Sequence, residues 1–353
     1  MHNAVTDHTD FDGGSDAYHR YSGFDIIGDI HGCGTTLKAL LERLGYQKKA
    51  GIYQHASRQA LFVGDVVDRG PHIRQALSIV YDMVSAGHAQ MVMGNHEYNA
   101  ICYMTPAPAE SGHTFLREHT PHHNRLIAET LEQFANHRED WSDYLQWFSE
   151  LPLFMETQAF RVVHACWDSD MIAQYRERYG SNRISLAVIN ESVQKGSFAS
   201  IVTDRLMRGT DIKLPDKQVI RSRDGHERRF FRTKFWAKKP ATYADVVFQP
   251  DPLPDTLIER VLTKKEKKRL SHYGENERPL FFGHYWLQGR PMPVRNNLAC
   301  LDYSAVKYGR LVAYRMDGEQ QLDPSKFVWV YVNTPEYEAM KSATQHSDDF
   351  YGE

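Results

Sequence analysis

The sequence predicts an α/β fold, because short buried strands alternate with amphipathic helices along its first part. Five short apolar runs each lead directly into a glycine or a histidine, which is the pattern of buried strands that end at a turn. These runs occupy 24–27, 60–63, 91–93, 162–163 and 280–282. In open α/β sheets, functional side chains gather at the carboxyl ends of the strands. We therefore expect the five strand ends to share one pocket.

Two helices are predicted between the first strands. Leucines recur at helical spacing from Leu37 to Leu44, and Gly45 then supplies a stop. A second helix is predicted from Pro71, whose fixed φ suits a first helical turn, to a stop at Gly87. The alternation of strand and helix supports the α/β class.

The rest of the chain departs from this alternation. Residues 105–152 are polar and aromatic, and we expect a helical insertion there. The last apolar segments alternate like antiparallel strands, and they lie at 298–301, 311–315 and 327–332. No repeat or flexible linker divides the chain. We therefore expect a single domain over 23–335, with a polar N-terminal arm over 1–22 and a polar C-terminal tail over 336–353.

Composition narrows the class of protein. A chain of 353 residues with 41% hydrophobic side chains can bury a large core. Its 42 basic and 45 acidic side chains give a formal charge of −3, which does not indicate a nucleic-acid partner. The four distant cysteines indicate free thiols in a reducing compartment. The sequence lacks a signal peptide pattern at its start and any run of about 18 apolar residues. We expect a cytoplasmic monomer with no membrane partner.

Three strand ends carry oxygen and imidazole groups beside glycine. They read GDIHG at 28–32, GDVVDRG at 64–70 and GNHE at 94–97. Each glycine lets the backbone turn sharply beneath a ligand. One such motif alone would be weak evidence, and an aspartate or asparagine after a strand often only caps a helix or makes a turn. All three in this order, followed by strands that end in His164 and His284, indicate a metal centre.

These motifs resemble the signatures GDxHG, GDxVDRG and GNHE of the PPP-type metallophosphoesterases, the family of calcineurin and the eukaryotic serine/threonine protein phosphatases. The resemblance covers 28–97 tightly and extends loosely, through the two later histidines, to about residue 315. It implies the metallophosphoesterase fold, a central β-sandwich of mixed sheets flanked by helices. It also implies two divalent ions that share one carboxylate. The implied ligands are Asp29, His31 and Asp65 for one ion, and Asp65, Asn95, His164 and His284 for the other.

The ligand chemistry suits hydrolysis of a phosphate monoester. Two close divalent ions can make hydroxide from a bridging water and neutralise the phosphoryl oxygens. The ions, two carboxylates and one hydroxide leave a charge of about +1, which favours an incoming dianion. The ligands are nitrogen and oxygen atoms without a thiolate, so Mn²⁺, Fe or Zn²⁺ would fit, and we favour Mn²⁺.

Three further residues gain roles from the resemblance. His96 would be the general acid for the leaving oxygen, and Asp68 would hold its other ring nitrogen. A positioned acid of this kind contributes about 10²- to 10⁴-fold in rate. Arg69 would bind the phosphoryl group, because its planar fork matches two oxygens at once.

Two departures from the eukaryotic pattern leave the substrate open. The family's HGG and GHT appear here as HACW at 164–167 and GHYW at 283–286. These variants look like the bacterial branch, which includes phosphatases active on phosphotyrosine and diadenosine tetraphosphate hydrolases. We expect a protein phosphatase acting on phosphorylated protein or peptide, with a dinucleoside polyphosphate hydrolase as the alternative.

The segment 213–239 is strongly basic. It holds ten lysines and arginines against three acids, and Asp224-Gly225 predicts a hairpin turn between 219–220 and 230–231. We expect a basic hairpin at the rim of the pocket, with Arg232 as the second phosphate-binding arginine that the family has. Its interleaved aromatic residues would form walls for a phenyl ring, and they are Phe230, Phe231, Phe235 and Trp236.

Two rival functions are weaker. A cysteine-dependent phosphatase needs an arginine six positions after its nucleophile, whereas the residues six beyond the four cysteines are Ala39, Pro108, Ile172 and Val306. A scaffold that has lost activity would be expected to lack a ligand or the general acid, and this sequence retains all of them. The histidines of the insertion match no known metal-site spacing, so we expect a solvated face there.

Overall fold

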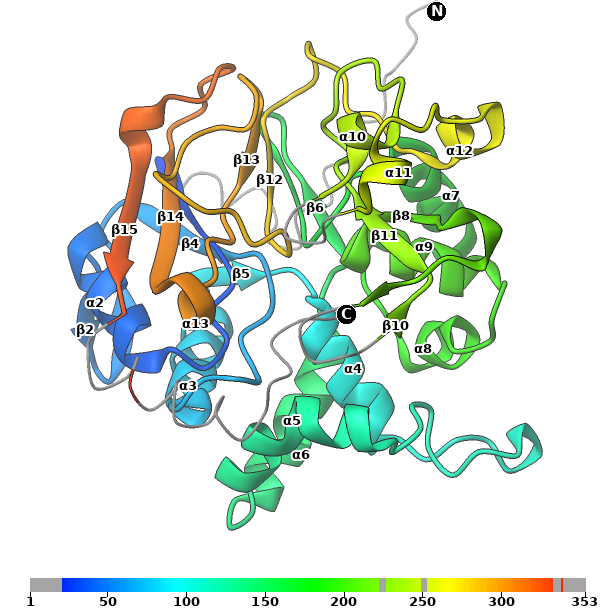
Figure 1. Ribbon diagram of the computed structural model, residues 1–353. Coiled ribbons are helices and arrows are strands. Elements are labelled where there is room, and N and C mark those ends of the chain that lie inside the picture. Colours follow the sequence, from blue (N-terminus) through cyan, green and yellow to red (C-terminus); the bar gives the residue numbers. More distant parts are fainter. Residues whose placement is uncertain (1–20, 222–226, 249–252, 333–337, 339–353) are drawn as a thin grey trace, which may run out of the picture.

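The computed structural model describes residues 21–221, 227–248, 253–332 and 338. Its two largest sheets pack against each other and are flanked by helices, as Figure 1 shows. The predicted α/β class and the predicted central sandwich of mixed sheets are confirmed.

The first sheet has five strands in the order β15-β14-β1-β4-β5. Their bounds are β1 Gly23–Ile27, β4 Arg58–Phe62, β5 Ala89–Met91, β14 Arg310–Met316 and β15 Phe327–Tyr331. Strands β1, β4 and β5 are parallel, whereas β14 is antiparallel to β1 and β15 is antiparallel to β14. The three parallel strands therefore present their carboxyl ends, and the three motifs that follow, at one edge.

The second sheet has four strands in the order β13-β12-β7-β6. Their bounds are β6 Phe154–Glu156, β7 Arg161–Val163, β12 Leu280–Phe282 and β13 Leu298–Cys300. Apolar side chains of both sheets form one buried cluster, in which Ile26 and Leu61 of the first sheet join Val162 and Phe281 of the second. This packing brings the carboxyl ends of β7 and β12 to those of β1, β4 and β5.

One predicted strand arrangement is wrong in part. The segment 298–301 was expected to be antiparallel, but β13 runs parallel to β12. All three of its residues are buried, which is typical of a parallel strand covered on both faces, so their side chains could not reveal a half-exposed antiparallel strand. The other two segments do pair as antiparallel strands, in β14 and β15.

Two helices pack against the first sheet as expected. Helix α2 (Gly34–Leu44) ends at Gly45, whose φ of 93° is the left-handed conformation that glycine adopts without strain. Helix α3 (Ile73–Ser85) begins two residues after Pro71 and is followed by a left-handed Gly87. Both helices bury their apolar faces in the largest core cluster. A short hairpin of β2 (Gln47–Lys49) and β3 (Ile52–Gln54) joins α2 to β4.

Helices also fill the predicted insertion. After α4 (Asn95–Met104), the insertion contains η1 (Ala109–Ser111), α5 (Pro121–Gln133) and α6 (Arg138–Phe148). Helix α5 lies beside α3 and α6 lies beside α4. The single-domain boundaries remain a prediction, since nearly all of the predicted arm and tail lies outside the described residues.

The chain between β7 and β12 forms a second layer of small elements, drawn in green and yellow in Figure 1. Its longer helices are α7 Ser169–Tyr179, α8 Leu186–Ser192 and α9 Phe198–Arg208. Its strands are β8 Thr210–Lys213, β9 Ile220–Arg221, β10 Glu227–Arg228 and β11 Phe230–Thr233. Short helices complete the chain, and they are η2 Pro215–Lys217, α10 Tyr243–Val246, α11 Asp255–Ile258, α12 Lys264–Arg269, α13 Ala305–Tyr308 and η3 Pro324–Lys326. The layer between β7 and β12 has its own small apolar core.

The basic hairpin is present with a different pairing. Strands β9 and β10 are antiparallel, and the expected turn at 224–225 lies outside the described residues. Phe230 and Phe231 belong to β11, which pairs with β8 and not with 219–220. The sequence could not show that the second run continues past β10 into another pair.

Two expectations about the whole chain can be compared with the structure. All four cysteines are buried thiols outside any disulfide, as predicted. Among the described residues, we find no helix with the length and apolar character needed to span a membrane.

Candidate metal centre

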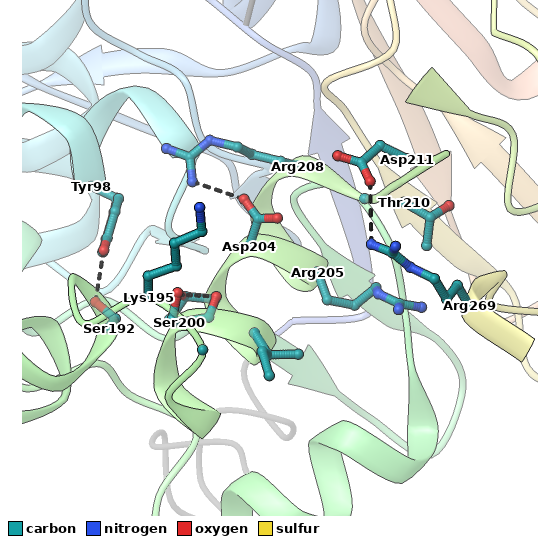
Figure 2. Close-up of a pocket in the computed structure, with 14 residues that line it drawn as sticks. Tyr98, Ser192, Lys195, Ser200, Asp204, Arg205, Arg208, Thr210, Asp211 and Arg269 are labelled. Carbon is teal, nitrogen blue, oxygen red and sulfur yellow. Dashed lines mark hydrogen bonds and ion pairs between the residues drawn. The ribbon is translucent and has the colours of Figure 1, made fainter. Parts of the chain in front are cut away.

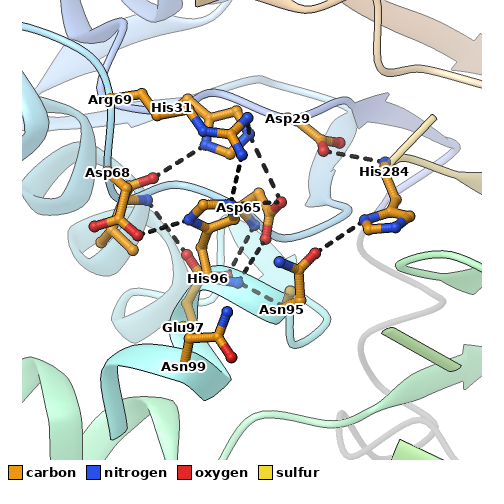
Figure 3. Close-up of polar contacts among 12 residues, drawn as sticks. Asp29, His31, Asp65, Asp68, Arg69, Asn95, His96, Glu97, Asn99 and His284 are labelled. Atoms are coloured by element: carbon orange, nitrogen blue, oxygen red, sulfur yellow. Dashed lines mark hydrogen bonds and ion pairs between the residues drawn. The ribbon is translucent and has the colours of Figure 1, made fainter. Parts of the chain in front are cut away.

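Loops after five strands converge at one end of the sandwich, as Figure 3 shows for most of the site residues. Several of their non-glycine residues have left-handed backbones, among them His31 (φ 43°), Asp65 (φ 54°) and His284 (φ 67°). Such conformations cost about 1–3 kcal/mol each and cluster at functional sites. Backbone hydrogen bonds hold them, because the Asp65 carbonyl accepts from the N–H groups of Ile30 at 3.0 Å and His31 at 2.8 Å.

Glu97 ties the second and third motifs together. Its buried carboxylate accepts hydrogen bonds from the backbone N–H groups of Asp65 at 2.8 Å, Val66 at 2.8 Å and Gly94 at 3.2 Å. Burial, together with the Asp65 charge, raises the pKa of Glu97 to about 7 in spite of these donors. Gly94 allows this close approach, since a Cβ there would lie 2.3 Å from the Asp65 nitrogen.

Asp65 belongs to two groups of potential metal ligands. One group contains His31, Asp65 and His96, the other contains Asp65, His164 and His284, and within each group the ligand atoms lie within 4.8 Å of one another. His31 Nε2 lies 3.7 Å and His164 Nε2 lies 3.3 Å from Asp65 Oδ2. This arrangement fits a carboxylate that bridges two ions.

Asn95 completes the second group. Its Oδ1 lies 3.1 Å from His164 Nε2 and 2.9 Å from His284 Nδ1. The other ring nitrogen of His164 donates to the Val63 carbonyl at 2.7 Å, which fixes the ring orientation. The structure therefore brings together Asp65, Asn95, His164 and His284, as the resemblance implied.

Two buried polar atoms of the site are available to a divalent ion. Asp29 Oδ1 and His284 Nε2 are buried and have no hydrogen-bond partner among the described residues. Burial lowers the pKa of His31 and of His284 well below the usual value, which favours the neutral imidazole that binds metal. Burial, and next the nearby Asp302, raise the pKa of Asp29 well above its usual value. Divalent cations would offset this crowding of buried acids.

His96 contacts Asp68 and Arg69, and it also belongs to a group of potential ligands with His31 and Asp65, where the resemblance implied Asp29. His96 Nδ1 is 2.6 Å from Asp68 Oδ2, so Asp68 holds one ring nitrogen of His96 as expected. Burial would lower the pKa of His96, but Asp65 and the Asp68 hydrogen bond outweigh it and raise that pKa. Arg69 Nη1 lies 3.3 Å from His31 Nε2, and its Nη2 lies 3.1 Å from His96 Nε2. The guanidinium is thus within reach of both a ligand and the candidate acid.

The insertion supports this histidine through Thr130 of α5. The Thr130 hydroxyl accepts from the backbone N–H of Asp68 at 3.1 Å and donates to Asp68 Oδ1. Gln133 of the same helix accepts from the Ile73 N–H at 2.7 Å and donates to the Gly70 carbonyl at 3.1 Å. Helix α5 therefore braces the loop that carries Asp68 and Arg69.

Replacing Thr130 by valine should lower the free energy of unfolding by about 1–3 kcal/mol, because it leaves the buried Asp68 N–H unsatisfied at nearly constant side-chain volume. Urea unfolding of both proteins would measure this change. Thr120→Val would not serve as a control for this change, because the Thr120 side chain caps α5. Thr256→Val, at an exposed position of α11, is the matched control. Equal unfolding midpoints for the parent and Thr130→Val would contradict the bracing role.

Asp302 is a buried carboxylate that the sequence analysis missed. It follows β13 by two residues, at the same kind of position as the ligands on neighbouring strands. Its Oδ1 accepts from the Ser304 N–H at 2.8 Å, whereas its Oδ2 has no hydrogen-bond partner among the described residues. The available signal was an apolar run, 298–301, that leads into an acid, but no motif singles it out.

The basic segment contributes less to the site than expected. Phe231 and Phe235 are each only 1% exposed and belong to cores, so they cannot form walls for a substrate; Phe230 is 42% exposed. Arg232 lies with its guanidinium 5.6 Å from the ring centre of Trp286, and its charge helps to lower the pKa of His284 after burial. The charge of Arg208, which sequence reasoning did not select, acts on His284 as well.

Comparisons with known proteins show what parts of this chain are similar to. Residues 23–176 match the family described as calcineurin-like phosphoesterase. A similar curated protein is the asymmetrical bis(5'-nucleosyl)-tetraphosphatase PrpE of Oceanobacillus iheyensis, 32% identical over 142 residues, which are 40% of this chain and 54% of the relative. The protein of that name from Bacillus subtilis is 29% identical over 159 residues, 44% of this chain and 62% of the relative.

The chain thus spans between about half and three-fifths of these two relatives. A crystal structure of a cold-active protein-tyrosine phosphatase from a psychrophilic Shewanella has a TM-score of 0.46 at 14% identity, over 86% of this chain and 81% of that one. The family match spans the three motifs and reaches beyond His164. Residues 23–176, which are less than half of the chain, are therefore similar to the calcineurin-like phosphoesterases.

Proposed function

We propose that this protein hydrolyses phosphate monoesters with two divalent metal ions. Mn²⁺, Fe or Zn²⁺ would fit the ligand set, and we favour Mn²⁺. The observation that carries the proposal is the position of Asp65, whose carboxylate belongs to both groups of potential ligands. When bound, the ions would supply a hydroxide nucleophile at neutral pH and neutralise charge on the phosphoryl oxygens. Asp29, His31 and Asp65 would hold one ion, and Asp65, Asn95, His164 and His284 the other.

The chain's own residues would then bind the phosphoryl group and deliver a proton. Arg69 would donate from its two Nη atoms to phosphoryl oxygens, exchanging its present contacts with His31 and His96. That exchange frees His96 Nε2 to carry a proton to the leaving oxygen. Asp68 holds His96 Nδ1 throughout, and Thr130 holds Asp68, so the ring keeps its orientation.

A simple assay tests the chemistry. Metal-free protein prepared with EDTA should not hydrolyse p-nitrophenyl phosphate, and Mn²⁺ should restore turnover. Turnover that persists in EDTA at the rate of the loaded protein would rule out the proposed function.

For the substrate, we favour phosphorylated protein or peptide side chains, phosphotyrosine among them. The metal centre would recognise a terminal phosphoryl dianion, and the basic segment beside it offers cations, whereas its Phe231 and Phe235 are buried. Hydrolysis of dinucleoside polyphosphates is the second candidate, and the names of the two curated relatives favour it.

We expect a phosphotyrosine peptide to have a higher kcat/KM than diadenosine tetraphosphate at one pH and one Mn²⁺ concentration. The physical reason is that a purine gains affinity from stacking on a free aromatic face, which the buried phenylalanines cannot offer. Parallel initial-rate measurements would decide between the two. A preference for the dinucleotide would reverse the substrate assignment and leave the metal chemistry intact.

A further inference from the structure

A cavity of about 420 Å³ lies beside α9 and β8, outside the metal centre, and Figure 2 shows its lining. This volume is within the range of small-ligand pockets. The lining comes from α4, from the end of α8 and the loop after it, from α9 and β8, and from the end of α12. Its charged residues are Lys195, Asp204, Arg205, Arg208, Asp211 and Arg269.

Arg208 connects this cavity to the metal centre. Its Nη2 donates to Asn99 Oδ1 at 2.6 Å, and Asn99 follows His96 by three residues on α4. Asn99 also lines a much smaller cavity together with Asp68 and His96. Arg208, from the wall of the larger cavity, thus contacts a residue that lines the smaller one. A substrate whose phosphoryl group lies under His96 could extend into this cavity.

The cavity has one positive charge without an acidic partner. Arg205 pairs with Asp168 at 3.1 Å, Arg208 with Asp204 at 3.3 Å and Arg269 with Asp211 at 3.6 Å. Lys195 makes no ion pair among the described residues, and Figure 2 shows its amine directed toward Arg208 and Asp204. The cavity and its ion pairs thus keep a net charge of +1. An anionic group is the ligand that this charge favours.

The lining does not suit a nucleobase. Tyr98 is the only aromatic residue among those that line the cavity, and it is 7% exposed. The guanidinium of Arg208 lies 5.6 Å from its ring centre, and its hydroxyl bonds Ser192 at 2.7 Å. A purine would therefore lack a free ring on which to stack. Charged and hydroxyl groups make up most of the remaining lining, which suits a carboxylate.

We propose that this cavity is a second anion subsite, which binds an acidic side chain close to the phosphorylated residue of a peptide substrate. Lys195 is its main specificity-determining residue, and Arg269 at the far rim assists it. The subsite rests on the proposed phosphoesterase function and adds a sequence preference to it.

The test uses a phosphotyrosine peptide whose other side chains are uncharged. A single glutamate is placed at one position at a time, and each version is matched by a peptide with glutamine at the same position. In the parent protein, glutamate at one or two positions should raise kcat/KM about twofold to fivefold over glutamine, the scale of an exposed charge pair. Lys195→Ala should reduce this ratio to about one, and Lys195→Arg should retain it. The matched control is Lys49→Ala, which replaces an exposed lysine of β2, and it should keep the parent ratio.

Each other outcome overturns the subsite. Equal rates on glutamate and glutamine peptides at every position, in a parent that hydrolyses p-nitrophenyl phosphate, would show that the chemistry is right and the subsite wrong. A ratio that survives Lys195→Ala and Arg269→Ala would do the same. If Lys195→Ala lowered kcat/KM more on diadenosine tetraphosphate than on the glutamate peptide, the cavity would be assigned to a phosphate chain. A parent inactive on p-nitrophenyl phosphate with Mn²⁺ would remove the proposed function and the subsite with it.

Discussion

Replacing Asp65 by asparagine is expected to lower turnover by at least about 10³-fold, because a bimetallic centre supplies several kcal/mol of transition-state stabilisation. Asp65 Oδ2 lies near imidazoles of both ligand groups, at 3.7 Å from His31 and 3.3 Å from His164. A neutral amide at this position would weaken the binding of both ions at once. Initial rates on p-nitrophenyl phosphate across a wide range of Mn²⁺ concentrations would measure the loss.

Asp143→Asn is the matched control for this change, since it converts an exposed aspartate of α6 to the same amide. It should leave both rate and Mn²⁺ dependence at parent values. If excess Mn²⁺ restored the parent rate in Asp65→Asn, a bridging role for the carboxylate would be excluded.

Replacing His96 by asparagine is expected to slow turnover by about 10²-fold or more on a poor leaving group while metal binding is retained. The loss should be smaller on p-nitrophenyl phosphate, whose leaving oxygen needs little protonation. The reason lies in the contact of His96 Nδ1 with Asp68 at 2.6 Å, which fixes the ring and leaves Nε2 for proton transfer. Comparing phenyl phosphate with p-nitrophenyl phosphate gives the two losses directly.

His113→Asn, at an exposed position of the insertion, is the control and should behave as the parent does. Equal losses on the two substrates in His96→Asn would mean that His96 is not the acid. A parallel loss of bound metal would instead make His96 a ligand, which its place in the group with His31 and Asp65 would allow.

The metal centre could be predicted from the sequence because its parts are local. Each motif joins a buried strand to a turn within a few residues, so Asp29, Asp65 and Asn95 could be assigned to strand ends without knowing the sheets. Their convergence with His164 and His284 was expected because functional side chains gather at the carboxyl ends of strands, whereas their division between two ions came from the family resemblance. The structure brings these residues together.

Other features depend on contacts that no local pattern encodes. Thr130 reaches Asp68 across 62 positions of sequence, so the bracing function of the insertion was not visible. Phe231 and Phe235 looked suited to a substrate wall, but burial is decided by which layer covers them. The cavity around Lys195 is likewise made from five separate segments.

The central claim is that one carboxylate serves two ions, and counting the ions tests it most directly. Metal-free parent protein would be titrated with Mn²⁺ and the bound metal measured per chain at equilibrium. The account predicts about two ions per chain in the parent and a weakening of both in Asp65→Asn. A single ion at saturation in the parent, with full activity, would contradict it.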